Sequence, residues 1–83
     1  MVTCQFSLYP LREASLSPAL DRAMEGVRSA GLVPEVGSMS THIEGEEGIV
    51  FEALRRAFRG AAEDAEVVLV ATVSNACRMP EAG

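Results

Sequence analysis

The stretch Gln5-Phe6-Ser7-Leu8-Tyr9-Pro10 decides the fold class, because it continues an alternating pattern that begins at Val2. Side chains alternate between the two faces of a β-strand, so one set faces the core and the other faces away from it. The core set is apolar and consists of Val2, Cys4, Phe6 and Leu8. The opposite set is polar but uncharged and consists of Thr3, Gln5, Ser7 and Tyr9. Such a surface suits a small polar ligand or a partner chain, although half-buried strands also tolerate these residues.

Two helices are predicted from apolar residues that recur at helical spacing. The first begins at Ser17-Pro18, with Ser17 as N-cap and Pro18 in the first helical position, and it stops at Gly31. Asp21 is predicted to lie in its first turn, where the helix dipole favours a negative charge. Its apolar face consists of Leu16, Leu20, Ala23, Met24, Val27 and Ala30. The second helix is predicted over residues 49–62, where the apolar residues form one broad face.

Three further strands complete the predicted order of elements. They span residues 33–39, 40–44 and 66–76. Pro34 places the first of them at an edge of the sheet, because proline cannot donate to a strand ladder. The continuous apolar run at 67–71 is typical of a strand that is covered on both faces.

The resulting order, βαββαβ, indicates a ferredoxin-like α+β sandwich. Right-handed crossovers place both helices on one face of a four-stranded antiparallel sheet. The 83 residues are expected to form a single domain, 1–83, around one core. The open face of the sheet then also carries Val68, Val70, Thr72 and Ser74. Because exposed apolar patches usually mark interfaces, we expect an oligomer.

The composition excludes several classes of function. The formal net charge is −5 and all seven basic residues are arginines, so the chain lacks the basic stripe that nucleic-acid binding needs. No apolar run is long enough to cross a bilayer, and the start of the chain does not have the pattern of a secretion signal. We therefore expect a cytoplasmic protein that neither binds nucleic acid nor inserts into a membrane.

No cluster of residues predicts catalysis, a metal or a cofactor. Cys4 and Cys77 do not have metal-binding spacing, and the single histidine, His42, is expected at a surface or an interface. No Ser-His-Asp, Cys-His or paired-carboxylate site is indicated. The first and last strands are antiparallel neighbours in this topology, so the two cysteines are expected to lie close together, in reduced form. These observations favour a protein that is not an enzyme.

Three segments, in this order and spacing, resemble the thiamine/hydroxymethylpyrimidine-binding family of YkoF type, including its single-domain members. They are FSLYP at Phe6–Pro10, the segment Ser40-Thr41 with Ile43-Glu44-Gly45 and Val50-Phe51, and the segment Val73-Ser74-Asn75-Ala76-Cys77. The resemblance covers residues 3–77. It implies a ferredoxin-like fold, ligand binding without catalysis, and assembly into dimers or tetramers.

The resemblance further implies that the chain binds thiamine or its hydroxymethylpyrimidine moiety, in support of uptake or salvage of thiamine precursors. The aminopyrimidine ring presents two nitrogen acceptors and one amino donor, which neutral hydroxyl and amide groups can match. The predicted ligand-binding residues are Ser7, Tyr9, Ser40, Thr41, Ser74 and Asn75. An apolar slot for the ring would come from Phe6, Tyr9 and Met39, and Glu35 or Glu44 would balance the thiazolium cation.

Two alternatives stay open at the level of sequence. A structural or regulatory oligomerisation domain, with no thiamine ligand, would pack its hydroxyl-bearing sheet face against another subunit. An enzyme of undefined activity is the other alternative. The sequence does not separate ligand binding from oligomerisation, because a cleft and an interface both need a partly apolar, hydroxyl-rich surface.

Overall fold

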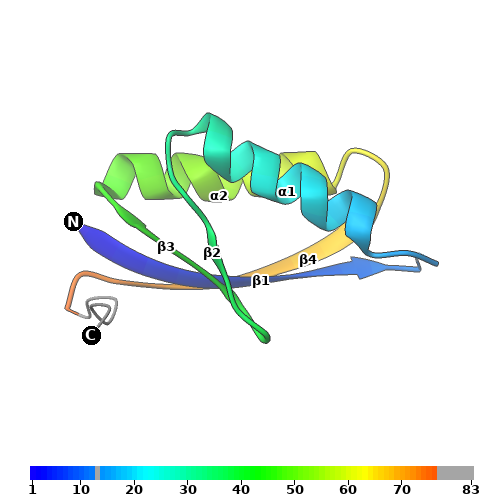
Figure 1. The fold of residues 1–83 in the computed structure, drawn as a ribbon, viewed down its shortest axis with the longest axis horizontal. Helices are drawn as coiled ribbons and strands as arrows, with labels where there is room; N and C mark the ends of the chain where they lie inside the picture. The colour runs from blue at the N-terminus through cyan, green and yellow to red at the C-terminus, as the bar shows by residue number, and fades with distance from the viewer. Residues whose placement is uncertain (13, 77–83) are drawn as a thin grey trace.

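Four antiparallel strands form one sheet, and two helices lie side by side on one of its faces (Figure 1). In the computed structural model, which describes residues 1–12 and 14–76, the order of elements is βαββαβ. The strands are β1 (Val2–Leu11), β2 (Glu35–Val36), β3 (Thr41–Gly45) and β4 (Glu66–Ser74), in the sheet order β2-β3-β1-β4. The helices are α1 (Ser17–Ser29) and α2 (Glu47–Ala61). This arrangement confirms the predicted α+β, ferredoxin-like fold.

The hydrophobic core lies between the sheet and the two helices. Cys4 and Phe6 of β1 and Ile43 of β3 are almost completely buried on the face that the helices cover. Val27 of α1 and Val50 of α2 are fully buried in the same cluster. Burying side chains of this size contributes about 1.5–3 kcal/mol each, so the inward set of β1 accounts for much of the core. The alternation predicted for this strand is therefore confirmed.

Small residues line the interface between α1 and α2, and the two backbones approach closely there. A Cβ atom on Gly26 would lie 2.5 Å from the carbonyl oxygen of Arg56, and one on Gly60 would lie 2.6 Å from that of Arg22. The two helices also contribute five buried alanines to the core: Ala19, Ala23, Ala53, Ala57 and Ala61. On its other side, α2 also contacts β1, β3 and β4.

The helix starts differ from those predicted. Ser17 is the first residue of α1 rather than its N-cap; Leu16 holds the cap position and makes no side-chain cap hydrogen bond. The second helix begins at Glu47, two residues before the predicted start, because the Glu46 carboxylate accepts hydrogen bonds from the backbone N–H groups of Gly48 and Ile49, at 3.0 and 3.3 Å. Glutamate is not among the favoured N-cap residues, so composition gave no signal for this start.

The strands also differ from their predicted bounds, because pairing sets their ends. β2 contains two residues instead of the predicted 33–39, although its position at the sheet edge agrees with the prediction from Pro34. β1 continues to Leu11 because β4 pairs with it along its whole second half. β3 is shifted by one residue from the predicted 40–44, and β4 ends at Ser74 rather than at residue 76.

The face of the sheet away from the helices is open in this chain. Val68 and Val70 lie on it and are 45% and 56% exposed, in agreement with their assignment to the open face. The expectation that the run at 67–71 is covered on both faces is therefore wrong for a single copy, because helices cover only one face.

Of the two cysteines, Cys4 lies in the described part of the chain. Cys4 is fully buried, and burial raises the pKa of its thiol. Cys77 lies outside the described residues, so its closeness to Cys4 stays a prediction. Within the described part of the chain, neither helix has the length and apolar character needed to span a membrane.

Candidate functional site

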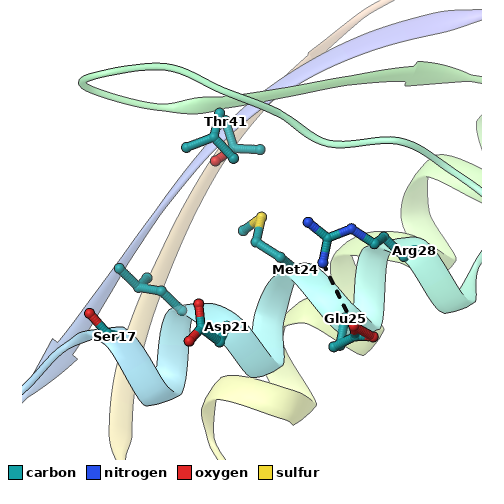
Figure 2. Close-up of a pocket in the computed structure, with 8 residues that line it drawn as sticks. Ser17, Asp21, Met24, Glu25, Arg28 and Thr41 are labelled. Atoms are coloured by element: carbon teal, nitrogen blue, oxygen red, sulfur yellow. Dashed lines mark ion pairs between the residues drawn. The ribbon is translucent and has the colours of Figure 1, made fainter.

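A cleft separates α1 from the hairpin formed by β2 and β3 (Figure 2). Its volume is about 540 Å³, within the usual range of small-molecule sites, roughly 300–1,000 Å³. The cleft is lined by Ser17, Leu20, Asp21, Met24, Glu25, Arg28, Val36 and Thr41. The charged members of this set all come from α1, whereas the hairpin contributes one apolar side chain and one hydroxyl.

A smaller hollow of about 210 Å³ continues the cleft toward β1. The two cavities share Leu20, Met24, Val36 and Thr41 in their linings. The smaller one adds residues 6–9 of β1 and the hairpin turn at 37–40. We refer to both together as the α1–hairpin cleft.

The register of the sheet explains why this region is open. β3 pairs with β1 only as far as Phe6, which lies opposite Thr41, whereas β4 follows β1 to Leu11. Beyond Phe6, β1 therefore has a paired strand on one side only. The hairpin turn is closed by the Gly37 N–H, which donates to the Ser40 carbonyl at 2.8 Å.

One hydrogen bond connects the hairpin turn to β1. The Ser7 hydroxyl donates to the carbonyl oxygen of Met39, at 3.2 Å. Ser7 therefore helps to hold the wall of the cleft in place, beside any direct contact it makes to a ligand.

Thr41 is the polar residue that the fold buries most deeply at this site. It lies opposite Phe6 on the helix-covered face and is 7% exposed. Its hydroxyl makes no hydrogen bond to any residue that the structure describes, and the oxygen is not sealed from the cleft. Figure 2 shows this oxygen on the side of the strand that faces α1. Buried hydroxyls are normally hydrogen-bonded, so this one is available to a bound molecule.

The charged side chains of α1 differ in whether they have a partner. Glu25 forms an ion pair with Arg28, with Oε1 and Nη1 3.8 Å apart. Arg22 is directed at α2, where its Nε donates to the Gly60 carbonyl at 2.8 Å. Asp21 has no ion-pair partner within residues 1–12 and 14–76, and Figure 2 shows its carboxylate directed into the space between helix and hairpin. The lining therefore carries one uncompensated negative charge.

The structure brings together four of the six predicted ligand-binding residues. Ser7, Tyr9, Ser40 and Thr41 all line the smaller cavity. Thr41, however, lies on the helix-covered face rather than on the open face to which the hydroxyl-rich surface was assigned.

Ser74 and Asn75 lie elsewhere. Ser74 pairs with Thr3, six positions along β1 from Tyr9, which corresponds to about 20 Å at 3.3 Å per residue. Within one copy of the chain they do not reach the α1–hairpin cleft, and their part in binding stays a prediction.

The carboxylates predicted to balance a thiazolium cation are not in the lining. Glu44 accepts a hydrogen bond from the Thr3 hydroxyl at 3.1 Å, and Glu35 lies opposite His42 at the sheet edge. Asp21 and Met24 of α1 line the cleft instead. Sequence reasoning assigned Asp21 to the helix dipole and Met24 to the core. The missed signal was a stripe at spacings of four, three and four along α1: Ser17, Asp21, Met24 and Arg28.

No cluster of three or more His, Cys, Asp or Glu side chains suited to a metal ion occurs among the residues described. A second set of charges lies outside the cleft, where Arg56 and Arg55 donate hydrogen bonds to Glu52 and hold the pKa of its carboxyl below the usual value. The chemistry that the cleft itself offers is neutral hydrogen bonding, apolar contact and one negative charge.

Comparison with known proteins adds to this geometry. The sequence model of a family described as thiamine-binding protein matches residues 4–76. No curated protein is significantly similar to the chain in sequence.

Several solved structures are similar to this fold. A domain of unknown function, DUF77, from Bacillus cereus has 29% identity and a TM-score of 0.76, covering 88% of this chain and 73% of its own. A hypothetical protein from Methanocaldococcus jannaschii has 25% identity and a TM-score of 0.81, covering 95% and 84%. A Thermotoga maritima protein assigned provisionally to thiamine biosynthesis or salvage has 28% identity and a TM-score of 0.73, covering 87% and 80%.

Proposed function

The chain belongs to the thiamine-binding protein family, and we propose that it binds thiamine or its hydroxymethylpyrimidine half in the α1–hairpin cleft, without catalysing a reaction. The observation that carries this proposal is the buried hydroxyl of Thr41, which opens onto a cleft of suitable volume. In a cell, such binding would support uptake or salvage of thiamine precursors in the cytoplasm. The similarity to the Thermotoga maritima protein is in line with this role.

The lining of the cleft matches the two kinds of surface on an aminopyrimidine. The flat ring needs apolar walls, which Leu20, Met24 and Val36 provide. The thioether of Met24 is well suited to an aromatic face, because sulfur makes favourable contacts with rings. The ring nitrogens and the amino group need donors and acceptors, and the hydroxyls of Thr41 and Ser40 can act as both.

Calorimetric titration with thiamine and with hydroxymethylpyrimidine tests the proposal. Thr41→Val keeps the shape of the side chain and removes the hydroxyl, and one neutral hydrogen bond is worth roughly 0.5–1.5 kcal/mol. We expect this change to lower the affinity for both ligands by about 2- to 12-fold. Thr41→Ser retains the hydroxyl and serves as the matched control. If the unaltered protein shows neither heat nor thermal stabilisation at millimolar thiamine, the binding proposal is wrong.

A further variant tests whether the site lies within one copy or between copies. Asn75 is remote from the cleft in a single chain, so Asn75→Ala should leave affinity unchanged if one copy makes the whole site. A loss of affinity as large as that of Thr41→Val would show that a second copy brings this segment to the ligand.

The open face of the sheet supports a second proposal, that the chain assembles as a homodimer or homotetramer. Tyr9, Val68 and Val70 are 53%, 45% and 56% exposed, and Tyr9 lies directly opposite Val68 on the neighbouring strand. Light scattering should give a multiple of 8.8 kDa, and Val70→Lys should lower the mass. Val33→Lys, at a site 86% exposed and outside the sheet, is the control. Assembly without any thiamine binding would favour the alternative, an oligomerisation domain.

A further inference from the structure

Asp21 has a position in the cleft that no established role of the chain explains. Its carboxylate faces the cleft without an ion-pair partner in the described part of the chain, while Glu25 on the next turn is paired with Arg28. The Thr41 hydroxyl lies on the opposite wall; unlike Asp21, Thr41 is buried, and its hydroxyl also lacks a hydrogen bond to a described residue. An uncompensated charge and an unpartnered buried hydroxyl thus line one cavity.

We propose that Asp21 determines the specificity of the cleft by holding the cationic end of an unphosphorylated, positively charged heterocycle, while Thr41 binds its neutral end. The inference rests on the proposed function, because it assigns the two ends of a thiamine-type ligand to the two walls of the cleft.

The difference in burial between the two residues sets this orientation. Thr41 is 7% exposed, whereas Asp21 lies on the exposed side of α1. Moving a charge out of water is far more unfavourable than moving a neutral polar group, so a cation stays near the solvent-exposed part of the site. The neutral aminopyrimidine therefore enters toward Thr41, and the thiazolium remains beside Asp21.

The charge of the lining also disfavours phosphorylated ligands. Two carboxylates, Asp21 and Glu25, and one guanidinium, Arg28, line the cleft, and that guanidinium is already paired with Glu25. A phosphate group at this mouth would meet a net negative wall on a chain whose formal charge is −5. We therefore expect thiamine to bind more tightly than thiamine monophosphate.

The test compares Asp21→Asn with a matched control. The change is isosteric and removes one negative charge from an exposed position. Glu63→Gln removes the same charge from an exposed residue after α2, outside the cleft lining. Calorimetry is run on both variants and on the unaltered protein, with thiamine, thiamine monophosphate and hydroxymethylpyrimidine as probes. The melting temperature of each variant establishes that it is folded.

Asp21→Asn should weaken thiamine binding by about tenfold, as expected for the loss of a charge-assisted contact, and should change hydroxymethylpyrimidine affinity by less than about twofold. It should also reduce the preference for thiamine over the monophosphate. Glu63→Gln should do neither. Added salt should weaken thiamine binding to the unaltered protein more than to Asp21→Asn.

The outcomes separate this inference from the proposed function. If the unaltered protein binds neither thiamine nor hydroxymethylpyrimidine, the proposed function itself fails. If it binds both, and Asp21→Asn binds thiamine as tightly as before, the function stands and the role of Asp21 is wrong. An equal loss for both probes also overturns the role, because it would show that Asp21 does not contact the cation selectively.

Discussion

The two sides of α1 meet their neighbours in opposite ways. Toward α2, Gly26 has no side chain and lets the two backbones approach closely, so that a single added methyl group there has no room. Toward the hairpin, longer side chains such as Asp21 and Met24 stand in an open cleft of about 540 Å³. One helix thus serves as a packing element on one side and as the wall of a binding site on the other. A rigid support on α2 keeps the cleft wall in position without filling the cleft.

The largest expected effect is a loss of stability caused by substitutions where α1 packs against α2. Gly26→Ala or Gly60→Ala places a Cβ atom within 2.5 or 2.6 Å of a backbone oxygen on the other helix, so the helices must separate. We expect a loss of about 1–3 kcal/mol in the free energy of unfolding, measured by urea denaturation. In Gly48→Ala the nearest atom is the Glu46 carboxylate at 3.3 Å, a flexible side chain, so this control should change stability little. Equal stability of all three variants would contradict the close packing of the helices.

Substitutions on the side of α1 that lines the cleft should change ligand affinity more than the free energy of unfolding. Met24→Ala removes an apolar wall of the cleft from a partly buried position, and it should weaken thiamine and hydroxymethylpyrimidine together by about tenfold. The free energy of unfolding should fall less than in Gly26→Ala, because the cleft already leaves this side chain incompletely packed. Calorimetry and denaturation on the same sample measure both quantities. Unchanged affinity would show that the ligand does not contact α1.

The smallest expected effect concerns the pH dependence of stability and comes from an ion pair, Glu52–Arg56, next to the contact between α1 and α2. Arg56 donates from Nε to Glu52 at 2.8 Å and from Nη1 to the Ser29 carbonyl at 2.7 Å, so it connects α2 to the end of α1. The hydrogen bond from Arg56 is the main cause of the lowered pKa of Glu52. A carboxyl whose pKa is lower in the folded state contributes stability above its unfolded pKa, and loses it as pH falls through the folded pKa.

Stability should therefore decline slightly as the pH falls below the usual glutamate range, near 4.3, and Glu52→Gln should reduce this decline. Because Glu52 and Arg56 are only partly buried, the change should be small and should shrink further in salt. Thermal melts between neutral pH and pH 3 measure it, with Glu63→Gln as the control. A pH dependence identical to that of the unaltered protein would show that the pair does not stabilise the contact between the helices.

The sequence predicted the fold well, because alternation and helical spacing are local patterns. The inward set of β1, the stop at Gly31 and the edge position of β2 all agree with the structure. It predicted the ends of elements less well. The start of α2 depends on a glutamate cap, and β2 is short because only Glu35 and Val36 pair with β3.

The candidate site was predicted only in part, for a similar reason. Ser7, Tyr9, Ser40 and Thr41 were identified as polar residues on strands, and the fold brings them to one place. Asp21 and Met24 were not, because Asp21 was assigned to the first turn of the helix and Met24 to the core. The placement of Asp21 was wrong, since α1 begins at Ser17 and its first turn contains no acidic residue. Ser74 has the same chemistry as Ser40, yet the register places it opposite Thr3, at the other end of the sheet.

By itself, the sequence determined the order of elements, the face of each strand that enters the core, and the neutral, hydroxyl-rich character of the strands. These properties follow from side chains and their immediate neighbours along the chain. Only the tertiary structure decided where a ligand can enter. The cleft exists because β3 pairs with β1 only as far as Phe6 and because α1 packs closely against α2. Both conditions depend on contacts between segments far apart in the sequence.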